Sequence, residues 1–249
     1  MSPGAPGATM RAMHDHPAHE TRHDAGDALR THRHGGAYAA LVVEGSHVET
    51  SADGPIESAP GTLILHPRYH AHGNRFGRLG ARVINLELPE SIEPSSLQAL
   101  RVEHIGEALD VFRRAPEQLG TLIVTATHAM PTPLLDWQPE FLGALMRSEL
   151  TIEQIARQAG VSIEHASRSF QKSHGMSPQN LRRELRCRRA LILLSGNTTL
   201  ADVAADSGFA DQSHLTRTVR AVTGLPPARL RRLGRHINCV QDALARAVR

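Results

Sequence analysis

The most constraining feature of this 249-residue sequence is an internal repeat in its second half. Residues 152–183 recur at 203–232, with an offset of 48 positions before the turn of each copy and 49 positions after it. Each copy predicts a short helix, a break that contains glycine, and a second helix with a central arginine, Arg168 in the first copy and Arg217 in the second. This is the pattern of a helix-turn-helix unit, whose second helix can enter the major groove of DNA. The repeat therefore predicts a protein that reads two groove segments.

Helix start and stop signals support this arrangement. Thr151 and Thr199 stand where the two first helices should begin, and the Gln or Asp three residues later gives the spacing of a helix N-cap. Between the copies, a Ser-Pro pair at 177–178 and a Gly-Asn pair at 196–197 bracket a longer helix, since Pro is tolerated at the first helical position and Gly at the end. We therefore expect one connecting helix that holds the two units at a fixed separation.

Charge is distributed unevenly along the chain. The formal net charge of +3 combines −5 over residues 1–136, +7 over 137–235 and +1 over 236–249. Lys172 is the only lysine, so the other cations of the basic half are arginines, whose planar guanidinium suits phosphate and guanine. A basic half that coincides with the repeat is typical of a nucleic-acid-binding protein, and a solvated cationic face is the alternative.

The repeated segments also resemble the DNA-binding units of a known family. GVSIEHASRSFQKSHGMSPQNLRR (160–183) and GFADQSHLTRTVRAVTGLPPARLRR (208–232) are similar to the first and second units of the AraC/XylS family of bacterial transcription regulators, in the same order and joined by a single helix. The resemblance covers about the last hundred residues. It implies that the second helices, about 163–172 and 211–220, enter two successive major grooves. The expected partners are double-stranded promoter DNA, a second copy of the chain in a homodimer, and RNA polymerase.

Carried over by position, the resemblance assigns residues to base contacts and to the DNA backbone. Arginine can donate two hydrogen bonds to guanine, glutamine can pair with adenine, and glutamate can accept from the cytosine amino group. Two positions depart from the family pattern: Ala166 stands where the second copy has Leu215, and Val219 stands where Phe is usual, so we expect thinner packing under both recognition helices. The expected base contacts are Glu164, His165, Ser167, Arg168, Gln212, Ser213, Thr216 and Arg217, and the expected phosphate contacts or helix-end charges are Arg182 and Arg231.

The first half of the sequence predicts β-structure. Short apolar runs at 38–43, 61–67 and 81–88 are separated by turn residues, and the last run alternates apolar and polar residues as a half-buried strand does. From 95 to 115, apolar residues at helical spacing predict a helix that packs on the strands or on a second subunit. The predicted segments are a flexible His-rich arm (1–25), a cupin-like sensor domain (26–92), a helical dimerisation or connector segment (93–136), an AraC-type DNA-binding domain (137–235) and a C-terminal tail (236–249).

Histidines concentrate in this half, with ten of the 16 in the first 72 positions. His32 and His34 alternate, so a strand there would point both to one face, from which they can converge with His72. Their spacing resembles the two motifs of the cupin barrel, the usual sensor fold in one branch of the same regulator family, which implies a divalent metal site for Zn, Fe, Ni or Cu. Tyr38, however, stands where cupins often have a metal-binding Glu.

The alternative to a metal is a pocket for a small organic ligand, formed by His32, His34, Tyr38 and His72, or histidines whose hydrogen bonds are satisfied within the fold. His66 and His70 have weaker claims to either site, because strand alternation can point them elsewhere.

Several function classes lack their sequence signals. Residues 19–23 formally match HExxH, but Pro17 precedes them and no amphipathic helix surrounds them, so we interpret the match as chance. There is no nucleophile elbow, phosphate-binding glycine loop or dinucleotide fingerprint. Cys187 and Cys239 form no CxxC pair, and no apolar stretch reaches the ~18 residues of a membrane span. The sequence therefore predicts a cytoplasmic protein that is not an enzyme.

Taken together, these signals predict an α+β chain in which a cupin-like all-β barrel precedes an all-α domain of two helix-turn-helix units joined by a connecting helix. The first functional hypothesis is a sequence-specific DNA-binding transcription regulator controlled by a small-molecule effector in the barrel. The alternatives are a metal-sensing regulator, a metal-dependent cupin enzyme with a DNA-binding appendage, and a constitutive DNA-binding protein whose barrel only dimerises.

Overall fold

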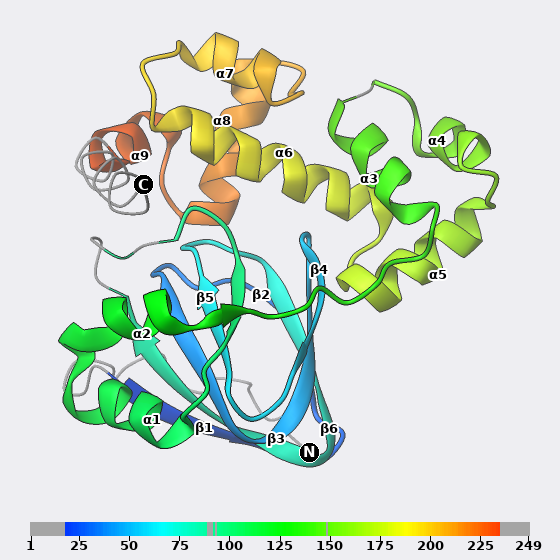
Figure 1. The fold of residues 1–249 in the computed structure, drawn as a ribbon. Coiled ribbons are helices and arrows are strands. Elements are labelled where there is room, and N and C mark those ends of the chain that lie inside the picture. Colours follow the sequence, from blue (N-terminus) through cyan, green and yellow to red (C-terminus); the bar gives the residue numbers. More distant parts are fainter. Residues whose placement is uncertain (1–17, 89–91, 93, 148, 235–249) are drawn as a thin grey trace, which may run out of the picture.

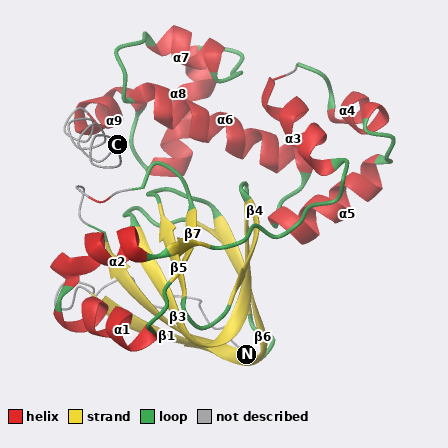
Figure 2. Cartoon of the chain, in the orientation of Figure 1, coloured by secondary structure: helices red, strands yellow, loops and turns green. Residues whose placement is uncertain are grey.

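The chain divides into a sheet half and a helical half. The computed structural model describes residues 18–88, 92, 94–147 and 149–234. Figure 1 shows strands that wrap around a common interior, with the helices of the second half gathered at one end of them. The predicted α+β class, an antiparallel sheet-rich domain followed by a helical domain, is confirmed (Figure 2). The predicted tail at 236–249 and residues 1–17 of the predicted arm lie outside the described residues.

The described strands form one antiparallel sheet in the order β1-β6-β3-β5-β7-β8, in which β2 also pairs with β6 and β4 with β3. The strands are β1 (Ala18–His23), β2 (Ala28–His32), β3 (Tyr38–Ser51), β4 (Gly54–Ser58), β5 (Thr62–His66), β6 (His72–Glu87), β7 (Gln98–Arg101) and β8 (Thr127–His128). β3 and β6 are the longest and pair with each other, so they form the spine of the sheet.

Irregular pairing between β3 and β6 bends this spine into a barrel. The register shifts between Val42 and Glu44 and again between Gly45 and His47. Gly45 has a left-handed backbone with φ 70°, and a Cβ there would lie 2.0 Å from the Gly80 carbonyl oxygen. Only glycine allows this close approach, and bulges of this kind increase the local bend of a strand. Beyond the bend, β3 pairs with β4 and with the first half of β6, so the sheet curves over its own face.

Helix α1 (Ile105–Arg114), the 3-10 turn η2 (Pro116–Gln118) and helix α2 (Leu119–Thr125) cover one face of the sheet. The helix predicted over 95–115 is wrong in its first part, because β7 occupies 98–101 and the helix begins at Ile105. Leu100 on β7 and Phe112 on α1 are buried in the same core. The apolar residues of a strand and of the helix that follows it therefore happened to fit the spacing of a single amphipathic helix.

The segment boundaries predicted for the first half of the chain also differ from those in the structure. β1 lies inside the segment predicted as an arm and pairs with β6 over its whole length. β7 pairs with both β5 and β8, so the sheet continues into the segment predicted as a connector. The reason is that a domain limited to 26–92 would leave unpaired sheet edges, which β1 and β7 cover with backbone hydrogen bonds.

In the helical half, the helices are α3 (Gln138–Arg147), α4 (Ile152–Gln158), α5 (Ile163–His174), α6 (Pro178–Leu194), α7 (Leu200–Asp206), α8 (Gln212–Thr223) and α9 (Pro227–Gly234). The predicted caps are confirmed: Thr151 and Gln154 form a reciprocal capping box, and the Thr199 side chain accepts from the Asp202 N–H. None of the described helices is long and apolar enough to cross a bilayer.

The two recognition helices, α5 and α8, place their large and small core residues in opposite order. In α5 the small Ala166 is followed by the large Phe170, whereas the equivalent positions in α8 hold Leu215 and Val219, and all four are fully buried. Trp137 and Phe141 lie against Phe170, with ring centroids 5.5 and 5.0 Å from it. In the second core, Phe209 from the turn packs with Leu215 and Val219. The expected thinning is therefore wrong, because neighbouring aromatic side chains fill the space.

Candidate nucleic-acid interface and histidine cluster

The predicted histidine set comes together at the end of the barrel that faces the helical half. His32, His34 and His72 each offer a ring nitrogen, and these atoms lie within 4.8 Å of one another. The Tyr38 hydroxyl forms a 3.0 Å hydrogen bond with His72 Nε2, so the fourth predicted ligand residue lies in the same cluster. Strand ends position three of them, since β2 ends at His32, β3 begins at Tyr38 and β6 begins at His72, and His34 lies in the loop between β2 and β3.

A second set lies deeper in the barrel and includes Glu49, which the sequence did not indicate, and His66, for which it indicated only a weaker claim. Glu49, His66 and His72 are all buried, and one ligand atom from each lies within 4.8 Å of the others. His66 Nε2 is 3.1 Å from both carboxylate oxygens of Glu49, and the Asn74 amide donates to Glu49 Oε2 at 3.3 Å. His66, moreover, stacks on the Tyr38 ring. The available signal was a charged residue inside an apolar strand, but the register shifts in β3 hid the face on which Glu49 lies.

The surroundings of the cluster shift the pKa values of His34, His72 and Glu49. Burial lowers the pKa of His72 to about 3 and the pKa of His34 to about 4, with the neighbouring histidines adding to the shift, so both rings are neutral at pH 7. Burial opposes ionisation of Glu49, but His66 and the other histidines outweigh it and lower the pKa of that carboxyl. Neutral imidazoles beside one carboxylate are the ligand types that bind borderline divalent metals.

The HExxH match does not form a zinc-protease site. His19 to His23 lie on strand β1, and the Glu20 carboxylate is engaged by Arg22, Arg82 and Arg113. His23 stacks on Phe76 with a centroid separation of 3.9 Å. The interpretation as a chance match is therefore confirmed, because strand geometry does not give the helical spacing that this motif needs.

The predicted base contacts lie at the surface of the two recognition helices. Ser162 and Asp211 cap these helices, each accepting a hydrogen bond from a backbone N–H three residues on. The residues expected to contact bases are exposed, except for Ser167 and Thr216, which are half-buried. Hydrogen bonds from its own backbone N–H and from Ser162 lower the pKa of Glu164, so it is a charged acceptor.

Some of these side chains already have partners within the fold. The Thr216 hydroxyl donates to the Gln212 carbonyl at 2.8 Å, and the His165 ring lies 5.6 Å from that of Trp137. Arg182 donates to the Leu150 carbonyl at 2.7 Å, and burial lowers its pKa, so the structure favours a structural role for it over the expected phosphate contact. Arg231 is half-buried, and its Nε and Nη2 atoms have no partner among the described residues.

The chain is similar to known regulators, and the family match falls in its helical half. Residues 145–233 match a family described as helix-turn-helix domain (HTH_18). The thermoregulatory protein LcrF of Yersinia pestis is 26% identical over 145 residues, which cover 58% of this chain and 52% of LcrF. The HTH-type transcriptional regulator ExsA of Pseudomonas aeruginosa is 25% identical over 139 residues, 55% of this chain and 48% of ExsA. The chain thus spans about half the length of these curated relatives.

Among solved structures, an AraC-type transcriptional regulator from Chromobacterium violaceum is 25% identical, with a TM-score of 0.37, and covers 40% of this chain and 92% of that one. ToxT from Vibrio cholerae is 13% identical, with a TM-score of 0.39, over 85% of this chain and 96% of ToxT. The family match lies wholly in the second half of the sequence. Residues 145–233 are thus similar to a helix-turn-helix domain, and the structure gives this half of the chain two such units.

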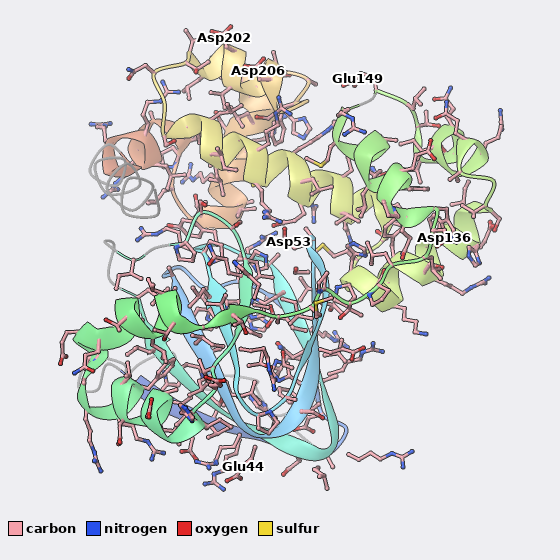
Figure 3. All side chains as sticks on the ribbon, in the orientation of Figure 1. Glu44, Asp53, Asp136, Glu149, Asp202 and Asp206 are labelled. Atoms are coloured by element: carbon pink, nitrogen blue, oxygen red, sulfur yellow. The ribbon has the colours of Figure 1, made fainter. Side chains whose placement is uncertain are left out.

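Two ion-pair systems connect the barrel to the helix-turn-helix half of the chain. Arg33, between His32 and His34, donates to both carboxylate oxygens of Glu184 on α6, where the Nη1–Oε1 distance is 2.9 Å. Glu184 is only 4% exposed. Asp53 accepts from His70 Nε2 and from Arg188 Nη1, both at 2.9 Å, and Figure 3 shows it at the end of the barrel that faces α6.

The loops that carry the clustered histidines are also tied to each other. Tyr69, which has a left-handed backbone with φ 60°, donates its N–H to the His34 carbonyl at 2.8 Å. Its own carbonyl accepts from Arg33 Nη1 at 3.1 Å. Arg33 and Glu184 further line a cavity of about 420 Å³ together with Arg217 on α8. The histidine cluster, the connecting helix and one predicted base contact are therefore neighbours in the fold.

Proposed function

We propose that the chain is a sequence-specific DNA-binding transcription regulator controlled by an effector bound in its N-terminal barrel. The observation that carries the proposal is the pair of equivalent recognition helices, α5 and α8, each with an exposed central arginine above a buried core. Helix α6 contributes Leu181 to the first core and Leu194 to the second, so a single helix fixes their separation. The relatives named as regulators support this role over a metal-dependent enzyme.

The test is a comparison of native promoter fragments with random duplex by fluorescence anisotropy at moderate ionic strength. Replacing Arg217 by Ala should weaken binding to the preferred fragment by roughly 5- to 150-fold, the effect of about 1–3 kcal/mol per lost base contact, and leave random duplex nearly unchanged. Arg114→Gln is the matched control, because Arg114 is an exposed arginine on α1 in the other half of the chain. Equal losses on all sequences would count against base reading, and no preference for any fragment would remove the proposal.

Two effector classes fit the barrel, and the geometry favours a metal ion. A polar organic ligand would contact His32, His34, Tyr38 and His72, whereas a divalent metal would bind the three histidines. The convergence of neutral ring nitrogens supports the metal, since an organic ligand does not require it. Promoter affinity measured with Zn²⁺, with a chelator and with a panel of organic ligands separates the two. Unchanged affinity throughout would indicate a constitutive DNA-binding protein.

A further inference from the structure

We propose that the barrel holds a borderline divalent metal ion through Glu49, His66 and His72, with His32 and His34 at its outer side. This inference rests on the proposed function, because it names the chemistry of the effector site. Glu49 and His66 extend the site inward from the three histidines that the sequence motif indicates. The position where a glutamate is often found holds Tyr38, and the carboxylate comes instead from farther along the same strand.

The inner set is built for a cation, whereas the outer set lacks charge. Three neutral imidazoles would leave both positive charges of the ion uncompensated in a buried place, which is costly. Glu49 is 2% exposed, and its carboxylate is contacted by His66 Nε2 at 3.1 Å and by the Asn74 amide at 3.3 Å. An ionised carboxylate beside a divalent ion lowers the energy of both. His72 belongs to both sets, so one ion can reach ligands from each.

The two ring nitrogens of His66 support the same location. His66 is 1% exposed, and its Nδ1 atom is buried without a hydrogen-bond partner among the described residues. A buried imidazole nitrogen without a partner normally destabilises a fold, so it calls for a functional explanation. The other nitrogen of the ring, Nε2, faces the Glu49 carboxylate, so a metal ion between the two residues would bind the lone pair of Nε2 and a carboxylate oxygen, with the proton of the neutral ring on Nδ1.

The distances are compatible with coordination after small side-chain movements. Tetrahedral nitrogen and oxygen ligands of Zn²⁺ lie at about 2.0–2.1 Å from the metal and hence roughly 3.3 Å from one another. The inner atoms lie within 4.8 Å of one another, so shifts on the order of 1 Å would complete the site. Histidine with a carboxylate selects Zn²⁺, Fe²⁺, Co²⁺ or Ni²⁺ over Mg²⁺ and Ca²⁺, which prefer oxygen ligands.

The experiment measures Zn²⁺ affinity of the full chain by chelator competition, with bound metal counted by mass spectrometry. Glu49→Gln and His66→Ala should each weaken binding by at least ~100-fold, above the range typical for residues that only orient ligands. His32→Ala and His34→Ala should have smaller effects. Glu57→Gln, an exposed carboxylate on the neighbouring strand β4, is the matched control and should bind as the parent chain does. Thermal unfolding in chelator shows whether each variant keeps its fold.

The inference is overturned if the parent chain binds no Zn²⁺, or if His32→Ala and His34→Ala abolish binding while a folded Glu49→Gln variant binds normally. Where His66→Ala fails to fold, Glu49→Gln and the cobalt absorption spectrum of the two proteins decide the question, because loss of a carboxylate ligand changes that spectrum. Promoter binding measured on the same preparations keeps the two proposals apart. Promoter preference without any metal binding removes only this inference, and metal binding through Glu49 without promoter preference removes only the proposed function.

Discussion

The two helix-turn-helix units have the same local design but different surroundings. The core of the first unit includes Ala52 and Ala71, which come from the barrel, whereas the core cluster of the second consists of residues from the helical half alone. The left-handed glycines that end the recognition helices show the same contrast. Gly175 accepts a hydrogen bond from Thr31 of the barrel, and a Cβ on Gly224 would meet nothing within 4 Å. The first unit thus packs against the barrel, and the second is attached through α6.

This difference indicates how two copies of one pattern can take different tasks. Helix α6 contacts the barrel through Glu184 and Arg188 and packs into the second core through Ala190 and Leu194. A change at the histidine cluster would therefore reach the second unit through α6, while the first unit stays fixed to the barrel. Such coupling requires that the effector binds one arrangement more tightly than another.

The largest contrast is expected between equivalent core positions. Phe170→Ala removes a ring that packs with Trp137 and Phe141, and should lower the free energy of unfolding by about 3–5 kcal/mol. Val219→Ala, at the same place in the second unit, removes two methyl groups and should cost about 2 kcal/mol. Urea denaturation gives both values. Because Phe170 lies in the core that barrel residues share, only its loss should also weaken metal or ligand binding; equal effects of both variants on the barrel would contradict the comparison.

The ion pair between Arg33 and Glu184 tests whether the barrel is fixed to α6. Arg33→Met leaves a carboxylate that is 4% exposed without its partner, which should cost about 3 kcal/mol of unfolding free energy. Arg82→Met is the control, because Arg82 pairs with the exposed Glu44 and with Glu20 at the barrel surface and its loss should cost under about 1 kcal/mol. Glu184→Gln should lower the free energy of unfolding less than Arg33→Met does, because it removes the buried charge instead of leaving it without a partner. Similar losses for the two arginine variants would show that the interface contributes little.

The sequence predicted the helical half well because its signals are local. Caps such as Thr151 and Ser177 and left-handed glycines such as Gly175 are set by residues within a few positions, so the repeat defines its own boundaries. Strand β1 and strand β7 escaped prediction because their pairing partners lie far away in the sequence. Their apolar content is low, and they are strands because they pair with the edges of the assembled sheet.

The candidate sites divide in the same way. Periodicity on α5 and α8 separates exposed from buried positions, so Arg168 and Arg217 could be placed on the surface from sequence alone. Glu49 could not be placed, because two register shifts in β3 change the face on which later residues lie. The packing partners of Ala166 were equally hidden, since Trp137 and Phe141 enter that core from an element outside the repeat.

Acid should destabilise the first unit through a histidine that the second unit lacks. His174 is fully buried at the end of α5, burial lowers its pKa to about 4, and Thr223 stands at the equivalent position of α8. Because the folded pKa lies below the unfolded value near 6.5, the unfolded state takes up the proton first. Stability is complete above about pH 6.5 and falls as the pH drops toward 4, by as much as roughly 3 kcal/mol.

The measurement is the free energy of unfolding against pH for the parent chain and His174→Thr. The barrel histidines His34, His47 and His72 also have lowered pKa values and remain in both proteins, so the difference between the two curves isolates His174. The curves should converge as the pH falls from 6.5 to 4. Parallel curves would mean that His174 does not contribute to the acid sensitivity of the first unit.

The smallest contrast is expected at the two glycines that end the recognition helices. Gly175 and Gly224 have φ of 69° and 73°, so an alanine is strained at both, by about 1–2 kcal/mol. Only at Gly175 would the new Cβ lie 2.5 Å from the Thr50 hydroxyl, so Gly175→Ala should cost about 1 kcal/mol more than Gly224→Ala in urea denaturation. In Gly175→Ala/Thr50→Ser the methyl group of Thr50 is gone and the hydroxyl can rotate away, which should remove most of that excess. If both alanine variants lose the same stability, the first unit is not in tight contact with the barrel at Gly175. Its attachment to the barrel would then depend on Ala52, Ala71 and the ion pairs alone.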